Sequence, residues 1–379
     1  MEMKTLGTVA TYINGRAFKP SEWEKAGIPI IRIQNLTSEN APYNYSKGIF
    51  EEKYIVHNGD LLFAWSASLG AHIWKGQDAW LNQHIFKVLP KEGIDRDYLY
   101  YFLLAVVAEL YAKTHGSGMV HITKAPFMNT PIPVPSLPEQ QRIVSRIEEL
   151  FSQLDAGVET LKKTKAQLAV FRQAVLKEAF AVCKEYVAIE SVTQHVTDGD
   201  HMPPPKADNG IPFIMISNIK GNAISWGNTA FVGRDYYDSI EPKRKPQNGD
   251  VLYTVTGSYG IPVLVDFNKE FCFQRHIALL RPNDAIEQKY LYYSLMEPSV
   301  YAQATKGATG TAQKTVGLGI LRKIEIPFIE NHSDQLRIVE AIESRLSVCD
   351  SIEHTVDTAL QQAEAMRQSI LKDAFEGKL

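Results

Sequence analysis

The sequence predicts a mixed α/β protein of the α+β class, in which two similar globular domains alternate with two long helices that form an antiparallel coiled coil. Two observations lead to this prediction. The chain repeats itself in the order domain, helix, domain, helix, and each helical segment carries one narrow apolar stripe. The length of 379 residues agrees, because a domain usually takes about 100–200 residues. We place the domains at 1–135 and 184–330 and the helices at 136–183 and 331–379.

Matched stretches show the internal repeat along the whole chain. GIPIIRIQNL at Gly27–Leu36 recurs as GIPFIMISNI at Gly210–Ile219, and NGDLLF recurs as NGDVLY. The longest match aligns Glu139–Phe180 with Asp334–Phe375 without a gap and has 16 identities in 42 residues. A period of about 190 residues is too long for a solenoid repeat. Each repeat unit therefore combines a globular domain with a helix, and a pseudo-twofold axis should relate the two units.

The first domain shows the short apolar runs and turn residues that are typical of strands. Runs at Ile28–Ile33, Leu61–Trp65 and Ile85–Leu89 lie between Gly, Asn, Asp and Pro residues. Asp97–Thr114 has the length and composition of a helix, and the proline-broken Pro131–Pro135 resembles an edge strand. Because the second domain repeats these features, we expect the same fold for both.

Each helical segment begins at a capping motif and continues with apolar residues seven apart. Ser136–Glu139 fits a capping box with proline in the first turn. Such spacing describes one stripe on a helix of about 60 Å, and the two stripes should cover each other. The small residues Gly157, Cys349, Ala359 and Ala363 would let the two helix backbones approach closely. The alternative is that each helix packs on its own domain. The predicted packing positions are Ile147, Leu154, Leu161, Leu168, Val175, Ile342, Cys349, Val356, Ala363 and Ile370.

Composition excludes several classes of protein. Cys183, Cys272 and Cys349 form no CxxC pair, so we expect neither a disulfide framework nor a structural metal. The beginning of the chain resembles no signal peptide, and the longest apolar run, Leu103–Ala108, is far shorter than a membrane span. We therefore expect a cytoplasmic protein that makes no membrane contact.

The charge distribution is uneven. The net charge is −3, but the last 46 residues alone carry 5 basic and 9 acidic side chains. Two segments, Leu110–Pro138 and Ser299–Ile324, contain no acidic residue at all. A polyanion could bind at such local basic patches although the whole chain is slightly acidic.

Motifs for catalysis are missing from the sequence. There is no phosphate-binding GxxxxGK[ST], and no complete GxSxG elbow. A nuclease interpretation would depend on Glu241-Pro242-Lys243 with Asp235 or Asp238, a pattern that is also common on exposed loops. We therefore expect no catalytic and no metal-ligating residues. The residues are compatible with a non-catalytic protein that binds DNA. Two alternatives to it stay open: a self-sufficient nuclease or methyltransferase, and a protein-interaction scaffold that binds no DNA.

Polar and aromatic side chains gather in the stretches that differ between the two repeats. Arg, Asn and Gln can form two hydrogen bonds to one base edge, while Lys and Ser mostly hold phosphates. The candidate DNA-binding residues are Trp65, Ser66, Ser68, Asn82, Gln83, His84, Ser117, His121, Lys124, His201, Thr256, Ser258, Tyr259, Gln274, Arg275, His276, Lys306, Thr309, Gln313 and Lys314. For any single residue, an ordinary exposed loop position is the competing interpretation.

The whole pattern resembles the specificity subunit of type I restriction–modification systems. The most specific stretches are PxPSLPEQQRIV at Pro133–Val144, Leu154–Phe180, and the C-terminal RQSILKDAFEGKL at Arg367–Leu379. GSGMVHIT at Gly116–Thr123 and Thr197–His201 also resemble that family's target-recognition domains. One departure is that the first helix ends in AFAVCKEY where the second ends in AFEGKL.

The resemblance implies a subunit without a catalytic centre. Each target-recognition domain would bind one half of a bipartite target in double-stranded DNA, and the helices would set the spacing between the halves. Two methyltransferase subunits would dock on the helices and bring S-adenosylmethionine. Motor–nuclease subunits would bring ATP and Mg²⁺, so this chain itself would bind no cofactor.

Overall fold

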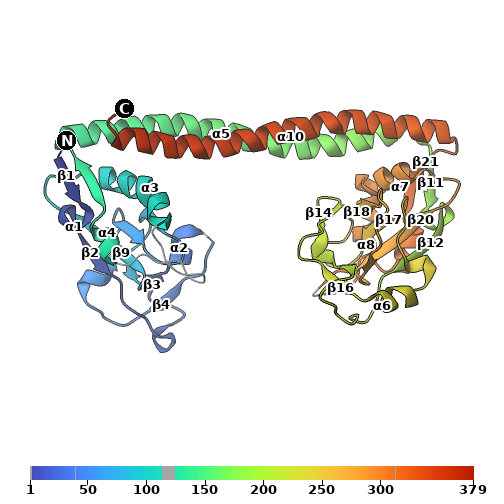
Figure 1. Cartoon of the computed structure of the whole chain (residues 1–379), viewed down its shortest axis with the longest axis horizontal. Helices are drawn as coiled ribbons and strands as arrows, with labels where there is room; N and C mark the ends of the chain where they lie inside the picture. The colour runs from blue at the N-terminus through green and yellow to red at the C-terminus, as the bar shows by residue number, and fades with distance from the viewer. Residues whose placement is uncertain (1, 39, 113–123, 312) are drawn as a thin grey trace. The chain divides into compact units, whose positions relative to one another are not determined.

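The structure, a computed structural model, describes residues 2–38, 40–112, 124–311 and 313–379 (Figure 1). It divides into two compact units, Met1–Leu161 with Thr358–Leu379, and Lys162–Asp357. Each unit holds one globular domain together with the parts of both long helices that pack on it. The four boundaries that we place from the sequence are not tested by this division and stay a prediction.

Strands and short helices alternate in both domains. Besides 3₁₀ turns, the first contains β1 (Glu2–Thr5), α1 (Leu6–Val9), β2 (Ala10–Asn14), β3 (Ile28–Ile31), α2 (Ile33–Thr37), β4 (Asn44–Ser46), β5 (Ile55–Val56), β6 (Leu61–Ala64), β7 (Gly70–Ile73), β8 (Ala79–Leu81), β9 (Ile85–Pro90), α3 (Arg96–Ala112), α4 (Lys124–Met128) and β10 (Pro131–Val134). The second contains β11 (Glu185–Ala188), β12 (Thr193–Asp198), β13 (Ile211–Ile214), β14 (Ile219–Lys220), β15 (Ala223–Ile224), β16 (Ala230–Val232), α6 (Arg234–Ser239), β17 (Val251–Thr254), β18 (Pro262–Leu264), β19 (Cys272–Phe273), β20 (Ile277–Pro282), α7 (Gln288–Leu295), α8 (Pro298–Gly307), α9 (Leu318–Lys323) and β21 (Glu325–Phe328).

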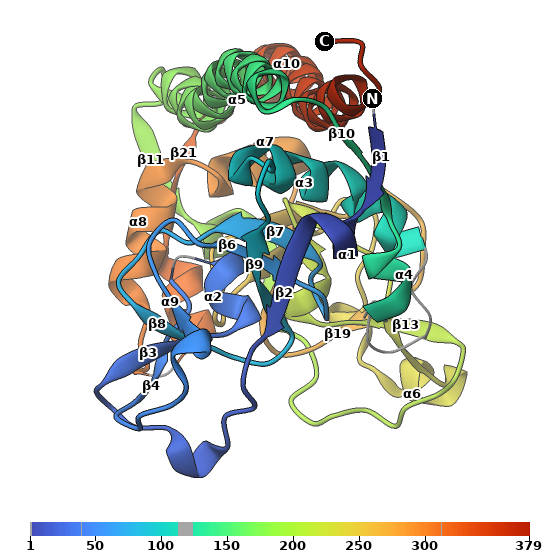
Figure 2. The same cartoon turned by 90° about the vertical axis from the view of Figure 1, so that its left-hand side faces the viewer.

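The two domains share the topology of their main sheet, whereas the second sheet has four strands in the first domain, β4-β3-β8-β5, and three in the second, β16-β13-β19. Each has a four-stranded antiparallel sheet, with the order β2-β9-β6-β7 in the first domain and β12-β20-β17-β18 in the second. A further sheet contains one parallel pair, β3 with β8 or β13 with β19. A two-stranded ribbon, β1-β10 or β11-β21, leads to the long helices. Figure 2 shows the first domain, in which α3 lies between the four-stranded sheet and the long helices.

The elements expected in the first domain are present. The apolar runs form β3, β6 and β9, and the expected helix corresponds to α3. Residues 113 and 114, the last two of the expected helix, lie outside the described part of the chain. The proline-rich stretch forms β10, which has a single partner strand in its two-stranded sheet. The prolines are tolerated there because an edge strand leaves one side of its backbone without ladder hydrogen bonds.

The repeated NGD motif has one structural role in both domains. Asp60 accepts a hydrogen bond from the backbone N–H of His57 at 2.7 Å and pairs with Lys87 at 2.8 Å. In the second domain Asp250 is buried and pairs with Arg281 at 2.7 Å. The aspartate therefore fixes the turn that begins the central strand and ties it to the neighbouring strand, β9 or β20.

The long helices α5 (Leu137–Phe180) and α10 (His332–Phe375) have 44 residues each, which corresponds to about 66 Å. Their ion pairs show an antiparallel arrangement. In the second unit Lys165 pairs with Asp357 and Arg172 with Asp350, each at 2.6 Å, so the α10 number falls as the α5 number rises. In the first unit Arg367 pairs with Asp155, which is the repeat equivalent of the Arg172–Asp350 pair. The predicted fold class is confirmed.

The predicted packing positions are covered in two different ways. Leu168, Val175, Cys349, Val356 and Ala363 are buried but belong to no domain core, as expected for residues between two helices. Leu154 and Leu161 are half-buried. Ile147 and Ile370 pack with the first domain, and Ile342 packs with the second. Part of the apolar stripe is therefore covered by the other helix, and part of it packs on the domains.

The expectation for Gly157 is wrong. The residue is exposed, and an added Cβ atom would find nothing within 4 Å. It lies on the outer face of α5, away from the apolar stripe, so it allows no close approach of the backbones.

Aromatic rings join the end of each long helix to a domain. Phe375, in the last turn of α10, contacts Tyr98 and Phe102 of α3, with ring centroids 5.2 Å apart in both pairs. Phe180, in the last turn of α5, contacts Tyr290 of α7 at 5.4 Å. Leu371 and Ala374 are also buried in the first domain's core. Each domain therefore completes its core with the end of a long helix.

A buried glutamine joins the beginning of each long helix to the same domain. The amide of Gln140 donates to the carbonyls of Gly93 and Pro135 at 2.9 Å and accepts from the backbone N–H of Asp95 at 2.8 Å. Gln335 makes the equivalent bonds to Ala285, Ile329 and Glu287. Both glutamines are fully buried. Their positions are identical in the repeat, but we did not single them out in the sequence because a polar residue adds nothing to an apolar stripe.

We predict that Gln140→Ala lowers the free energy of unfolding of the first unit by about 3 kcal/mol or more. The substitution leaves one buried backbone N–H and two carbonyls without this partner, and each such loss costs about 1–3 kcal/mol. The measurement is a urea titration followed by tryptophan fluorescence. Gln141→Ala is the matched control, because Gln141 is exposed and its loss should change stability by less than about 0.5 kcal/mol. Equal midpoints for the two variants would contradict the assigned role.

Candidate nucleic-acid interface

The predicted contact residues of each domain converge at one end of its four-stranded sheet. Ala64, the last residue of β6, is opposite Ile85, the first residue of β9. The loop after β6 and the segment before β9 therefore lie side by side. The same holds in the second domain, where Thr254 is opposite Ile277. This brings Trp65, Ser66 and Ser68 next to Asn82, Gln83 and His84, and Thr256, Ser258 and Tyr259 next to Gln274, Arg275 and His276.

A glycine at the end of the first strand of this sheet allows a close approach. Gly15 follows β2 and Gly199 follows β12. A Cβ atom on Gly15 would lie 1.9 Å from the carbonyl oxygen of Asn82, and one on Gly199 would lie 2.0 Å from that of Phe273. The segment before β9 or β20 is thus held directly against the end of its neighbouring strand.

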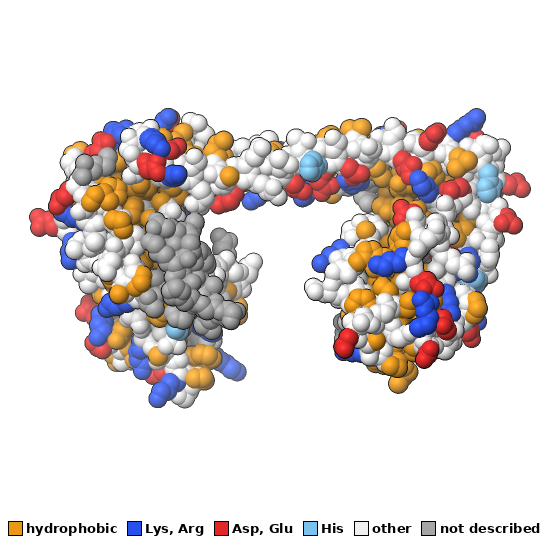
Figure 3. All heavy atoms as spheres, viewed as in Figure 1, with side chains coloured by type: hydrophobic (Ala, Val, Ile, Leu, Met, Phe, Trp, Pro, Cys, Tyr) orange, Lys and Arg blue, Asp and Glu red, His pale blue; other side chains and the backbone are white. Residues whose placement is uncertain are grey.

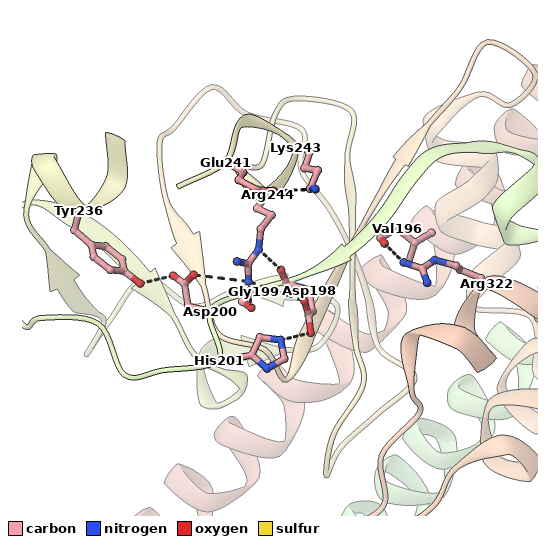
Figure 4. A network of polar contacts seen from close by, with 10 residues as sticks. All are labelled: Val196, Asp198, Gly199, Asp200, His201, Tyr236, Glu241, Lys243, Arg244 and Arg322. Carbon is pink, nitrogen blue, oxygen red and sulfur yellow. Dashed lines mark hydrogen bonds and ion pairs between the residues drawn. The ribbon is translucent and has the colours of Figure 1, made fainter. Parts of the chain in front are cut away.

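A polar network around Asp198–His201 stiffens this region of the second domain (Figure 4). His201 pairs with Asp198 at 2.8 Å, and the hydroxyl of Tyr236 donates to Asp200 at 2.7 Å. Arg244 donates to the carbonyl of Asp198 at 2.9 Å and also to the carbonyl of Gly199. Burial and the hydrogen bond to Asp200 raise the pKa of Tyr236, so it stays a neutral donor at physiological pH. The guanidinium of Arg244 is therefore engaged within the domain.

Five predicted residues of the second domain line one hollow of about 400 Å³. They are His201, Thr256, Arg275, His276 and Gln313. Its other lining residues are Asp198 and Thr315, so the lining is polar throughout. The structure therefore assembles side chains that are far apart in the sequence into one surface that can donate and accept hydrogen bonds.

The remaining predicted residues of the second domain lie around this hollow. Lys306 is exposed in the last turn of α8, and Thr309 and Lys314 are exposed in the loop that follows. Ser258 is exposed in the loop after β17, whereas the ring of Tyr259 stacks on Tyr301 at 5.8 Å. Thr256 is buried and its hydroxyl accepts a hydrogen bond from Thr315.

The first domain offers a more aromatic surface at the equivalent place. Trp65 donates to Asn14 at 3.1 Å and its ring lies 4.9 Å from that of His84. Arg16 pairs with Glu22 at 2.6 Å, so its charge is compensated. Ser66 is buried and could reach a ligand only if its loop moved. Ser68, Gln83 and Lys124 are exposed, while Ser117 and His121 lie outside the described residues.

Three residues of the nuclease pattern take part in ion pairs at the surface. Lys243 pairs with Glu241 at 2.8 Å in an exposed turn, and Asp238 lies 3.7 Å from Arg234. Within the described residues, no three His, Cys, Asp or Glu side chains are placed to hold a metal ion. Among the same residues, no helix is long and apolar enough to cross a membrane.

Acidic side chains gather along the helix pair (Figure 3). In the second unit they include Asp350, Glu353 and Asp357, which surround Lys165 and Arg172. A surface of this kind repels phosphates. The helices are therefore less suited to bind a polyanion than the sheet ends of the domains.

Comparisons with known proteins place these observations in a family. The sequence model of the type I restriction modification DNA specificity domain matches residues 1–169 and 198–362. The chain is 26% identical to the type I restriction enzyme EcoBI specificity subunit of Escherichia coli, over 99% of this chain and 85% of that protein. It is 25% identical to the MjaVIII specificity subunit of Methanocaldococcus jannaschii, over 87% of this chain and 81% of that protein.

Solved structures share the fold. A chain from a study of complex assembly and conformational transition of the type I R-M system superimposes with a TM-score of 0.72 at 19% identity, covering 100% of this chain and 98% of that one. The HsdS subunit from Thermoanaerobacter tengcongensis gives a TM-score of 0.52 at 19% identity, covering 100% and 97%.

We predict that Gly199→Ala destabilises the second unit by about 1–3 kcal/mol or more, because the new methyl group overlaps a backbone carbonyl that cannot rotate away. The same urea titration measures the change. Gly227→Ala is the control, since a Cβ atom there meets nothing within 4 Å and the backbone has an ordinary φ. An unchanged midpoint for Gly199→Ala would show that the two segments are not in contact.

Proposed function

Because the chain belongs to the family of the type I restriction modification DNA specificity domain, we propose that it is the DNA-reading subunit of a type I restriction–modification complex. One observation carries the proposal. Two domains with the same four-stranded sheet present different side chains at the same sheet end, with Gln83 in the first domain where Arg275 stands in the second. Two recognition domains that share this sheet but differ in their contact residues would recognise two different half-sites. The target would therefore be bipartite.

We further propose that the paired helices set the distance between the half-sites. A helix of 44 residues is about 66 Å long, which corresponds to about 19 base pairs at 3.4 Å each. This length accommodates two short half-sites and an unread spacer. In each unit, buried stripe residues and cross-helix ion pairs hold α5 and α10 together, and this pairing supports the role because it would stiffen both helices.

The partners follow from the family as proposals. We infer that two methyltransferase subunits dock on the helices and bring S-adenosylmethionine, and that motor–nuclease subunits bring ATP and Mg²⁺. This chain would be non-catalytic and would bind no cofactor itself, in keeping with the absence of catalytic motifs from its sequence. The family match does not support the alternative of a scaffold that binds no DNA.

Lengthening both helices tests the spacing role. We predict that one inserted heptad between Leu161 and Lys162 and one between Asp357 and Thr358 lengthens the spacer by about 3 base pairs, because seven residues add about 10 Å while the stripe keeps its register. The half-site sequences should stay the same. Methylation-site sequencing in cells that carry the chain with its methyltransferase partner gives the target.

Two controls accompany this experiment. A heptad inserted in α5 alone should abolish methylation, because the two stripes no longer match over their length. The purified chain alone, incubated with duplex DNA, Mg²⁺ and labelled S-adenosylmethionine, should transfer no methyl group. New half-sites with an unchanged spacer would refute the proposed spacing role.

We also predict that replacing Lys306 and Lys314 by alanine weakens binding to all DNA sequences equally. Both side chains are exposed, and Lys314 follows Gln313, which lines the hollow. Each lost phosphate contact lowers the slope of log K against log salt by about 0.9. Titration of a labelled duplex at several salt concentrations measures the slope. The double variant Lys162→Ala and Lys163→Ala, on the exposed face of α5, is the control and should leave the slope unchanged. A loss confined to one target base would argue against phosphate contacts.

A further inference from the structure

The segments Asn82–His84 and Gln274–His276 occupy the same place in the two domains and are held by the same backbone hydrogen bonds. Gln83 N–H donates to the carbonyl of Arg16 at 2.9 Å, and Arg275 N–H donates to that of Asp200 at 3.0 Å. The carbonyls of His84 and His276 accept from the loop after β6 or β17 at 3.0 and 2.9 Å. Bonds on both sides fix the direction in which the middle side chain leaves the backbone.

Within each segment the outer two side chains are half-buried and the middle one is exposed. Gln274 is hydrogen-bonded to the ring of His276, and both are half-buried. His84 lies against Trp65 and has a φ of 73°, a left-handed conformation that a residue other than glycine adopts only under constraint. Gln83 and Arg275 alone point to solvent in their segments.

Arg275 has no charge partner among the residues that the structure describes. Two carboxylates of the network described above are already engaged, Asp198 by His201 and Asp200 by Tyr236. Burial, and then the positive charge of Arg275, lower the pKa of His276, so this ring adds no second charge at neutral pH. The guanidinium keeps its full hydrogen-bonding capacity.

Arg275 also lines two hollows of different chemistry. One is the polar hollow of about 400 Å³ described above. The other, of about 350 Å³, has seven apolar residues among its thirteen lining residues, including Met202, Pro204 and Phe231. A planar base edge that meets the guanidinium would find both polar and apolar groups around it. A phosphate contact needs neither this fixed direction nor such surroundings, and the exposed Lys306 and Lys314 suit that role better.

We infer that residues 83 and 275 are one shared base-reading position, used with a different residue in each domain. Arg275 would donate two hydrogen bonds to O6 and N7 of a guanine, the pairing that the geometry of its planar guanidinium fits. Gln83 would donate to N7 and accept from the N6 amino group of an adenine in the other half-site. The inference rests on the proposed function, since it requires that each domain reads one half-site.

The test is selection of bound duplexes from a random pool by the full chain with its methyltransferase partner. Arg275→Gln should change one G·C pair of one half-site to A·T and weaken binding to the original target at least about tenfold. Gln83→Arg should change one A·T pair of the other half-site to G·C. Arg275→Lys keeps the charge but not the fork of donors, so it should relax the preference at that pair only.

Two matched controls add or remove the same groups elsewhere. Arg234→Gln removes an exposed arginine of the second domain, and Gln77→Arg adds one to the first domain. Both should select the original target. Circular dichroism shows whether each variant is folded, and a variant that selects a new motif is folded by that fact alone.

The outcomes separate the inference from the proposed function. If the unchanged chain selects a bipartite motif and the variants at 83 and 275 select the same motif, the inference fails and the proposed function stands. Uniform weakening of all sequences with a reduced salt slope would make Arg275 a phosphate contact and would also overturn it. If the unchanged chain selects no motif, the proposed function fails and takes the inference with it.

Discussion

The constraint on which the rest of the structure depends is the double attachment of each domain to the long helices. A buried glutamine amide holds the beginning of one helix, and an aromatic ring holds the end of the other. Hydrogen bonds from an amide are directional, and the ring is buried against a tyrosine that is itself fully buried. The domain is thereby fixed to its helix ends both in position and in orientation.

In each domain, one strand connects the attachment to the long helices with the recognition surface. β9 begins directly after Asn82–His84 and ends shortly before Gly93, whose carbonyl accepts from Gln140. β20 likewise connects Gln274–His276 with Ala285 and Gln335. Each strand has six residues, about 20 Å, and is paired on both sides. The base-reading position and the attachment to the long helix thus lie at opposite ends of one strand that is paired on both sides. A shift at either end of this strand moves the other.

Most of the architecture could be predicted from the sequence, because the repeat and the seven-residue stripe depend on apolar spacing that any helix or strand must obey. The convergence of the candidate residues needed the strand register, since Thr256 and Arg275 meet only because β17 pairs with β20. The engagement of Arg244 is invisible in the sequence, because its partners are backbone carbonyls. The burial of Ser66 and the outward position of Gly157 were unforeseen for a related reason. Neither a small polar residue nor a glycine shows by itself which way it faces.

The packing of Phe375 against the first domain's core has a consequence for how the protein is made. A ribosome releases residues 1–135 long before it reaches Leu371, Ala374 and Phe375, which complete that domain's hydrophobic interior. The second domain receives Leu176 and Phe180 before its own strands emerge. The domain that is synthesised first is therefore the last to be closed. The nascent chain therefore exposes an incomplete apolar surface for most of its translation. In a product of premature termination this surface would stay exposed to chaperones and proteases.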